Sequence, residues 1–345
     1  MNPVKASFDV SLAEDVVNAG KCQGCGACVL VCPFNCLEYS NEKPRLVREC
    51  KVCGVCALAC PQYEWSTPEI ENFVFGRKRK SGESFGIYKR LAIAKTVDSQ
   101  ILKVCQDGGA VTTLLLSALK EGLIDGAIVT KNKKDKPFYP HPTLATTAEE
   151  ILQSAGTKYF YSPTILALKE AIKKKKSNLA FVGTPCQIRA IRKMQMMRLK
   201  KYVAPLKFLI GLACSECFTY EGLMENYIHR ILGINPKSIK KIDVKGKMLI
   251  KLDSETVRIP ISETKKYARQ SCHFCQDFSS ELADISAGAL GLKGWTFVII
   301  RTEKGDELFY NAEKAGAIRI KDASEDADAL NLLNKLSRKK RRVLG

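Results

Sequence analysis

The chain has 345 residues and carries 55 Lys and Arg against 36 Asp and Glu, which gives a formal net charge of +19 at pH 7. That length accommodates one small module beside a larger domain with its own core. The longest apolar run, residues 208–214, falls well short of the roughly 20 residues that cross a bilayer, so we expect no membrane-spanning helix. So large a charge favours anionic partners, among them nucleic acid, lipid headgroups, an acidic subunit or a polyanionic cofactor, and charge alone does not choose among these.

Two nearly identical cysteine runs lie between residues 22 and 61. Each has the spacing C-x2-C-x2-C-x3-C-P, in which three thiolates bind one cubane cluster and the fourth thiolate binds the twin cluster. This crossover gives one [4Fe-4S] cluster to Cys22, Cys25, Cys28 and Cys60, and the other to Cys32, Cys50, Cys53 and Cys56. The pattern predicts a protein that carries electrons.

Structural zinc and disulfide bonds are the two other uses of such cysteines. Zinc knuckles use separated C-x2-C pairs, whereas here a continuous run of four cysteines closed by proline occurs twice. Disulfides form in oxidising compartments and usually follow an export signal, but residues 1–20 show no basic start followed by an apolar run. We therefore expect clusters in a reduced, cytoplasmic setting.

Downstream of the cysteine runs, predicted strands and helices alternate. Residues 65–80 have mixed polarity and little periodicity, which is typical of a linker. Apolar or alternating segments predict strands over 91–97, 126–130, 178–182, 203–214 and 295–301, and short antiparallel strands within 239–259. Helical spacing and capping residues predict helices over 110–120, after a capping box at Thr147 and Glu150, from Ser162 and Pro163 into the following lysines, and over 187–197 and 221–232. Lys304 and Gly305 predict a turn after the last strand.

This order predicts an α/β core with added antiparallel β structure, preceded by a small α+β domain of the bacterial two-cluster [4Fe-4S] ferredoxin type. The predicted ferredoxin domain covers residues 1–75 and the linker covers 76–85. The core covers 86–325, and residues 326–345 form a C-terminal helix with a basic tail.

Seven cysteines remain outside the two runs. Free cysteines are usually buried small hydrophobes, and this is the expected role of Cys36 and Cys105. Cys272 and Cys275 form a C-x2-C pair, which in a cytoplasmic protein indicates a metal site or a redox couple. Cys186 and Cys214 follow predicted strands, at the end of an α/β sheet where ligand sites gather. Together these four thiolates would suffice for a third cubane, with Cys217 as a spare candidate.

A glycine-containing turn at residues 106–110 lies between a predicted strand and a predicted helix. Glycine permits close approach of a ligand, and a helix N-terminus presents N–H groups and a positive dipole end, so diphosphates bind at such places. A simple tight turn explains the same residues. The chain has no G-x-G-x-x-G in the right context, so a standard dinucleotide fingerprint is absent.

The core resembles the flavin-containing β subunit of coenzyme F420-reducing hydrogenase and its relatives in F420-dependent formate dehydrogenase and F420H2 dehydrogenase. The resemblance covers residues 86–301. Its motifs are Gln106, Asp107, Gly108 and Gly109 with Val111 and Thr112; Gly156, Thr157, Lys158 and Tyr159; Pro185, Cys186 and Gln187 with Ile191, Arg192, Lys193 and Met194; Cys214; Cys272 and Cys275; Glu281, Leu282, Ala283 and Asp284 with Ser286 and Gly288; and Gly294, Trp295, Arg301 and Thr302. A ferredoxin module ahead of such a core is similar to the input subunit of F420H2 dehydrogenase.

The resemblance implies FAD bound to the core, with its phosphates near Gly108 and Gly109. The implied contacts are Gln106, Asp107, Gly108, Gly109, Ala110, Thr112, Thr157, Lys158, Tyr159, Gly183, Thr184 and Gln187. It also implies a [4Fe-4S] cluster at Cys186, Cys214, Cys272 and Cys275, which would make three clusters in the chain. Cys217 falls where the hydrogenase subunit carries another residue, so it is left out of this ligand set.

The implied activity is that of an F420 oxidoreductase subunit that oxidises F420H2 by hydride transfer to FAD. A hydride carries two electrons and a cubane accepts one, so FAD would divide the pair before the clusters pass single electrons onward. The reaction depends on orientation, and we assign no catalytic side chain. The polyanionic tail of F420 would suit the basic surface. The implied partner is a larger redox complex, foremost a membrane-associated F420H2 dehydrogenase with this chain docked peripherally on the inner face.

Three alternatives remain at this point. The chain could be a flavin-free iron–sulfur adaptor, an F420-coupled subunit of a hydrogenase or formate dehydrogenase, or a cluster-containing nucleic-acid-binding protein. The basic runs lack interleaved aromatic residues and any recognisable recognition module. Nucleic acid is therefore not the expected partner.

Overall fold

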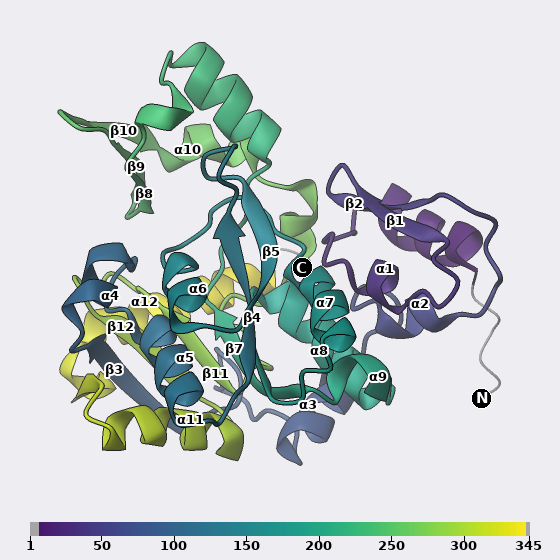
Figure 1. The fold of residues 1–345 in the computed structure, drawn as a ribbon, viewed down its shortest axis with the longest axis horizontal. Coiled ribbons are helices and arrows are strands. Elements are labelled where there is room, and N and C mark those ends of the chain that lie inside the picture. The colour runs from purple at the N-terminus through teal and green to yellow at the C-terminus, as the bar shows by residue number, and fades with distance from the viewer. Residues whose placement is uncertain (1–6, 343–345) are drawn as a thin grey trace.

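The computed structural model describes residues 7–342 and shows a small N-terminal module beside a larger α/β core (Figure 1). The module contains a π-helix, two short α-helices and a two-stranded antiparallel sheet in which Leu37 pairs with Leu46. Both α-helices begin after a glycine in the left-handed conformation, Gly26 and Gly54, as expected for two copies of one cysteine run. The elements are η1 (Phe8–Asn18), α1 (Ala27–Val31), β1 (Leu37–Ser40), β2 (Lys43–Leu46) and α2 (Val55–Ala59).

The core is built on an eight-stranded mixed sheet with the order β13-β3-β12-β11-β7-β6-β4-β5. The four strands β11, β7, β6 and β4 run parallel to their neighbours within this group, and the remaining pairs are antiparallel. The strands are β3 (Arg90–Thr96), β4 (Gly126–Asn132), β5 (Pro140–Ala145), β6 (Leu179–Gly183), β7 (Leu206–Leu212), β11 (Ile285–Gly288), β12 (Thr296–Ile300) and β13 (Ile318–Asp322).

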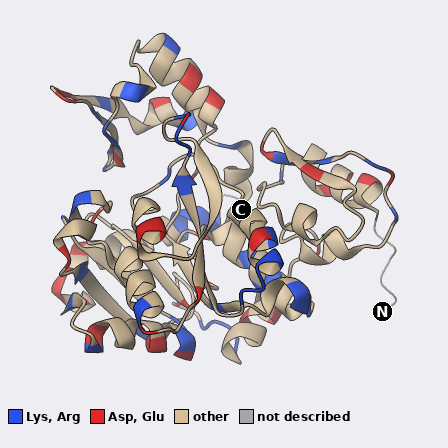
Figure 2. Ribbon diagram, viewed as in Figure 1, with Lys and Arg blue, Asp and Glu red and all other residues tan. Residues whose placement is uncertain are grey.

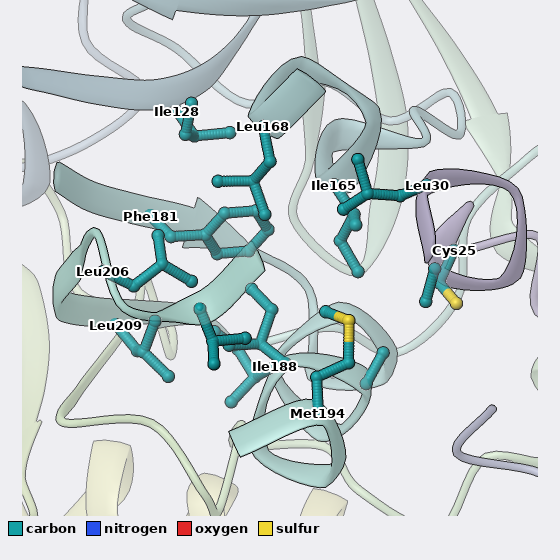
Figure 3. Packing of buried hydrophobic residues seen from close by; sticks show 14 of the residues in the cluster. Cys25, Leu30, Ile128, Ile165, Leu168, Phe181, Ile188, Met194, Leu206 and Leu209 are labelled. Atoms are coloured by element: carbon teal, nitrogen blue, oxygen red, sulfur yellow. The ribbon is translucent and has the colours of Figure 1, made fainter. Parts of the chain in front are cut away.

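Helices cover both faces of this sheet. Successive residues of a strand point to opposite faces, so Phe208 and Leu209 of β7 belong to different buried clusters. Leu114 of α5 and Phe309 of α11 pack on the Phe208 face. Ile188 of α8 packs on the Leu209 face with η2 and α7 (Figure 3). The helices of the core are α4 (Ser99–Val104), α5 (Ala110–Lys120), α6 (Ala148–Gln153), η2 (Thr164–Ala167), α7 (Leu168–Lys173), α8 (Pro185–Met196), α9 (Lys200–Val203), α11 (Glu303–Lys314), η7 (Ala323–Glu325) and α12 (Ala327–Arg341).

A second sheet extends from the core as a three-stranded arm. It has the antiparallel order β10-β9-β8 and packs against the long π-helix η3 through Met248, Ile250 and Leu223. The elements of this region are η3 (Tyr220–Ile231), η4 (Pro236–Ser238), β8 (Lys241–Val244), β9 (Lys247–Lys251), β10 (Thr256–Pro260), α10 (Ile261–Thr264), η5 (Lys265–Tyr267) and η6 (Gln270–Phe274).

The module shares a hydrophobic core with the sheet domain. Leu30 of α1 and Ala59 of α2 belong to the same buried cluster as Ile188 and Met194 of α8 (Figure 3). Lys193 on α8 is 2% exposed, and its ammonium donates to the carbonyls of Cys60 at 2.8 Å and Ala57 at 3.4 Å. The second cysteine run therefore contacts the core directly.

The segment between module and core is anchored by ion pairs. It includes α3 (Thr67–Phe75), which packs near α8. Arg79 pairs with the buried carboxylates of Glu71 and, at 2.6 Å, Glu281. Arg341 at the end of α12 pairs with Glu281 as well, at 2.5 Å. One buried acid thus connects the segment and the C-terminal helix to the core.

The mixed α/β core with added antiparallel sheets is confirmed, whereas several local predictions are wrong. The stretch 65–80, predicted as a linker, contains the helix α3. The predicted turn at Lys304 and Gly305 lies inside α11, because the Thr302 hydroxyl caps this helix by accepting from the Gly305 N–H at 3.2 Å. Gly305 serves close packing instead: a Cβ there would lie 2.1 Å from the Asp284 carbonyl oxygen. The strand predicted over 203–214 is shorter: α9 ends at Val203, and β7 covers Leu206–Leu212.

Candidate functional site

The structure gathers the cysteines of the N-terminal runs into two groups. Burial raises the pKa of Cys25 and Cys28, and electrostatic interaction with the neighbouring Cys22 and Cys60 raises it further. These four thiols are called the first ferredoxin site below. Cys56 interacts in the same way with the other three, and the group is called the second ferredoxin site: Cys32, Cys50, Cys53 and Cys56. Each group draws its fourth cysteine from the opposite run.

The four cysteines of the second ferredoxin site line one hollow. Two backbone amides donate to its sulfur atoms: Phe8 N–H to Cys50 Sγ at 3.4 Å, and Cys36 N–H to Cys32 Sγ at 3.3 Å. Cys36 itself is buried and donates its own thiol to the Glu49 carbonyl, so it packs beside the site. Cys53 is exposed, which places one edge of this site at the molecular surface.

Cysteines from three separate parts of the core line another hollow, called the core hollow below. Cys186 lies in the first turn of α8, which a capping box of Thr184 and Gln187 fixes. Cys214 follows β7, and its N–H donates to the Phe278 carbonyl at 2.8 Å. The cysteines of the hollow are Cys186, Cys214, Cys217, Cys272 and Cys275.

Burial makes these thiols poor thiolates in the absence of a cation. It raises the pKa of Cys25 to about 12 and that of Cys272 to about 11. A bound metal keeps such a sulfur deprotonated. No three His, Cys, Asp or Glu side chains within 7–342 are arranged to hold a single metal ion. A cubane binds its four thiolates through different iron atoms, so its ligands need not converge on one metal ion.

Cys217 is the fifth thiol of the core hollow. Its Sγ lies 3.8 Å from Cys214 Sγ, and its N–H donates to Cys272 Sγ at 3.4 Å. We expect Cys217→Ser to retain the iron of the core hollow, because a serine there keeps the amide that supports Cys272. The matched variant Cys214→Ser should lose about a third of the protein's iron. Iron and sulfide analysis compares the two; equal iron in both variants, or greater loss with Cys217→Ser, contradicts the assignment.

The turn before α5 requires a glycine for close packing, and it leads into a helix N-terminus that no side chain of residues 7–342 caps. A Cβ on Gly108 would lie 2.6 Å from both the Ala94 carbonyl oxygen and the Thr296 nitrogen, so this glycine lets the turn pack on the sheet. Gly109 has φ 73° and begins α5, where no side chain among residues 7–342 caps the helix. Ala110 and Thr112 form its buried first turn. The free N–H groups and dipole suit an anion such as a diphosphate.

Side chains from distant segments surround this turn. The Gln106 side-chain carbonyl accepts from Thr157 N–H at 3.3 Å, and its amide donates to Asp243 and to the Tyr159 hydroxyl. Two lysines of the three-stranded arm add positive charge: Lys241 donates to the carbonyls of residues 105 and 106, and Lys245 donates to Asp107 at 3.1 Å. Asp107 and Asp243 pair with these lysines, so the uncapped start of α5 is the feature of this turn that suits a phosphate group.

The remaining predicted flavin contacts have local roles. Lys158 donates to the carbonyls of residues 154, 155 and 156 at the end of α6, and burial lowers its pKa to about 8. Gly183 ends β6, and a Cβ there would lie 2.7 Å from Gln187 Oε1. Thr184 and Gln187 cap α8, and Gln187 also donates to the Ser162 carbonyl. Thr184 and Gln187 thus position Cys186 in the first turn of α8.

Several residues at the sites were not predicted from the sequence. Gln23, Arg269 and Lys340 line the core hollow, and Lys241 and Lys245 flank the glycine turn. Arg269 lies three residues before Cys272, which is the only local signal for it. The others reach their sites through contacts between distant segments.

Family models match most of the chain. Residues 91–169 match the N-terminal part, and residues 176–326 the C-terminal part, of the family described as coenzyme F420 hydrogenase/dehydrogenase, beta subunit. Residues 15–38 match a 4Fe-4S binding domain, which confirms the iron–sulfur character of the module.

Individual relatives agree with these models. The chain is 39% identical over 261 residues to coenzyme F420 hydrogenase subunit beta of Methanothermobacter thermautotrophicus, which covers 74% of this chain and 92% of that protein. It is 32% identical over 305 residues to a subunit of the F420H2 dehydrogenase of Methanosarcina mazei, covering 86% and 83%. A chain of the F420-reducing [NiFe] hydrogenase complex from Methanosarcina barkeri superposes with a TM-score of 0.72 at 36% identity, covering 76% and 92%. The chain belongs to the family of coenzyme F420 hydrogenase/dehydrogenase β subunits.

Proposed function

We propose that the chain oxidises F420H2 by hydride transfer to bound FAD and passes single electrons through [4Fe-4S] clusters to a partner complex. The observation that carries this proposal is the core hollow, where thiols from separate segments meet beside the first ferredoxin site. When bound, FAD can accept an electron pair and release it one electron at a time, and the clusters can carry single electrons.

The residues of the chain would hold these groups in a fixed order. In the core hollow, Cys186, Cys214, Cys272 and Cys275 would bind one cluster. The start of α5 would bind the diphosphate of FAD, with Lys241 and Lys245 close to it. Among the thiols of the core hollow, Cys275 is buried, whereas Cys186, Cys214 and Cys272 are partly exposed.

Neighbouring cysteines connect the three sites in series. Cys186 of the core hollow interacts electrostatically with Cys25 of the first ferredoxin site. Cys28 of that site interacts with Cys56 of the second. Since Cys53 of the second ferredoxin site is exposed, electrons would leave the chain there.

Lysines and arginines on the three-stranded arm and on α7 and α9 suit anionic partners (Figure 2). We propose that the arm receives the phosphate and glutamate tail of F420. None of the helices within residues 7–342 has the length and apolar character that crossing a membrane requires. The relatives are named as subunits of a hydrogenase and a dehydrogenase, so we propose peripheral docking on a larger redox complex, such as an F420H2 dehydrogenase at the inner face of the membrane.

An anaerobic assay of F420H2 oxidation with an artificial acceptor tests the proposal. Protein loaded with clusters and flavin should turn over, and the visible spectrum should show flavin that acid releases. Turnover failure by fully loaded protein contradicts the proposal. Purified protein that retains clusters but binds no flavin would identify an electron-transfer adaptor instead.

A further inference from the structure

The loop between Cys22 and Cys25 of the first ferredoxin site forms part of the wall of the core hollow. Gln23 of this loop lines the hollow together with Tyr161 and Arg269 of the core. Gln23 is 6% exposed and Arg269 is 5% exposed, so the contact is closed to solvent. Two candidate cluster sites are therefore neighbours across the boundary between module and core.

Arg269 connects the two sides of this boundary. Its Nη1 donates to the Gln23 carbonyl at 2.8 Å, and its Nη2 donates to the Glu42 carbonyl at 2.9 Å. Its Nε pairs with the Glu42 carboxylate at 3.1 Å, and its guanidinium lies 3.9 Å from the centre of the Tyr161 ring. On the core side, its backbone carbonyl accepts from Cys272 N–H at 2.9 Å. One side chain thus holds the loop of Cys22 against the segment of Cys272.

The local backbone is shaped around this arginine. Gly24 has φ 64°, and a Cβ at this position would lie 2.5 Å from the Glu42 carbonyl oxygen and 2.8 Å from Arg269 Nη2. A glycine is therefore required where the guanidinium enters the module. The backbone of the ferredoxin loop is therefore shaped to accommodate the Arg269 side chain.

Buried polar atoms beside Arg269 lack a partner. Within residues 7–342, both amide atoms of Gln23 and the Tyr161 hydroxyl are buried and make no hydrogen bond. A buried donor left unpaired is costly, so the two donors among these atoms, the Gln23 amide nitrogen and the Tyr161 hydroxyl, point to an occupant that accepts hydrogen bonds. Cluster sulfur atoms accept such bonds, and both residues line the core hollow.

The charge of Arg269 acts on both sites. It interacts electrostatically with Cys22 of the first ferredoxin site and with Cys272 of the core hollow. A cluster gains a negative charge when it is reduced, and nearby positive charge in a buried setting stabilises that form. Since Arg269 is almost fully buried, solvent screens this interaction weakly.

We propose that Arg269 is the positioning residue of electron transfer between core and module: it fixes the Cys22 loop on the core hollow and raises the reduction potentials of the clusters on both sides. In this step one electron leaves the core cluster, which is oxidised, and enters the first ferredoxin cluster, which is reduced. No bond or proton changes. The inference rests on the electron path of the proposed function, but reduction potentials measured with a chemical reductant test it without F420.

Potentiometric titration of the holoprotein, followed by electron paramagnetic resonance, tests the charge directly. Arg269→Gln should lower the reduction potentials of the core cluster and the first ferredoxin cluster by about 59 mV each. For one electron this shift is about a tenfold decrease in the equilibrium constant for reduction. The second ferredoxin cluster should keep its potential and serves as an internal reference. Arg269→Lys retains the charge and should restore the potentials.

Glu42→Gln provides the opposite test, because it removes the negative charge that pairs with Arg269. The same two reduction potentials should rise. A merely structural role of Arg269 instead predicts that the Arg269 and Glu42 variants both lose iron or shift these potentials equally. Arg45→Gln removes an exposed positive charge from the same module and should shift no potential. Unchanged potentials in an iron-replete Arg269→Gln protein, or shifts of the same sign in the Arg269 and Glu42 variants, overturn the proposal.

Discussion

Cys275→Ser is expected to remove the cluster of the core hollow while both ferredoxin clusters stay bound. Cys275 is 8% exposed and lines the core hollow, and neither ferredoxin site includes it. Serine is a poor ligand for iron beside the other three thiolates, and Cys217 is outside the assigned ligand set. Iron and sulfide should fall by about a third.

The same variant separates the path of the electrons from the binding of the clusters. Dithionite should still reduce the two ferredoxin clusters, whereas F420H2 should not. Cys105→Ser is a matched control, because Cys105 is equally buried and lies outside all three sites. Loss of all iron in proportion, with the control intact, would show that the core hollow holds no separate cluster.

Asp284→Ala is expected to cause a large loss of stability without touching a candidate ligand. Asp284 is 2% exposed and accepts from Arg192 Nη2 at 2.8 Å, from Leu209 N–H at 2.8 Å and from the Thr302 hydroxyl at 2.7 Å. Its removal leaves a buried guanidinium and a buried amide without their acceptor. Breaking a buried ion pair in this way costs about 3–5 kcal/mol.

Denaturant unfolding of the wild type and the variant, monitored at matched cluster content, measures this effect. Asp306→Ala is the control, since Asp306 pairs with Arg90 at 3.4 Å and its side chain is 40% exposed. An exposed pair contributes about 0–1 kcal/mol. A similar loss in both variants would contradict the role of Asp284 as a buried acceptor.

Local sequence signals predicted much of the fold. The helix predicted over 110–120 matches α5, because Gly109 starts it and apolar residues then follow the helical period. Thr147 caps α6 as predicted, accepting from Glu150 N–H at 3.2 Å. The Glu150 carboxylate, however, accepts from Thr146 rather than Thr147, so only half of the predicted capping box forms. Gly305 misled the prediction because a glycine in close packing resembles a glycine in a turn.

The candidate sites likewise contain residues that local sequence patterns predicted and residues that they did not. The cysteine spacing predicted the two ferredoxin sites, whereas Cys186 and Cys214 were assigned to the core hollow from their places after predicted strands and from the family resemblance. The roles of all these cysteines as ligands stay predictions. The pairing of Gln23 with Arg269 joins residues 246 positions apart, and no local pattern encodes such a contact. Asp284 shows the converse: a residue in a motif shared with the family serves here as a buried partner of Arg192.

Anaerobic addition of F420H2 to the fully loaded protein, with no other acceptor, tests the central claim most directly. A single addition of F420H2 should reduce the clusters. The electron paramagnetic resonance signals of the ferredoxin sites should appear in the wild type and be absent in Cys275→Ser. Signals of equal size in the two proteins would show that electrons reach the module without the core hollow. No cluster signal in the loaded wild type would contradict the claim that this chain draws electrons from F420H2.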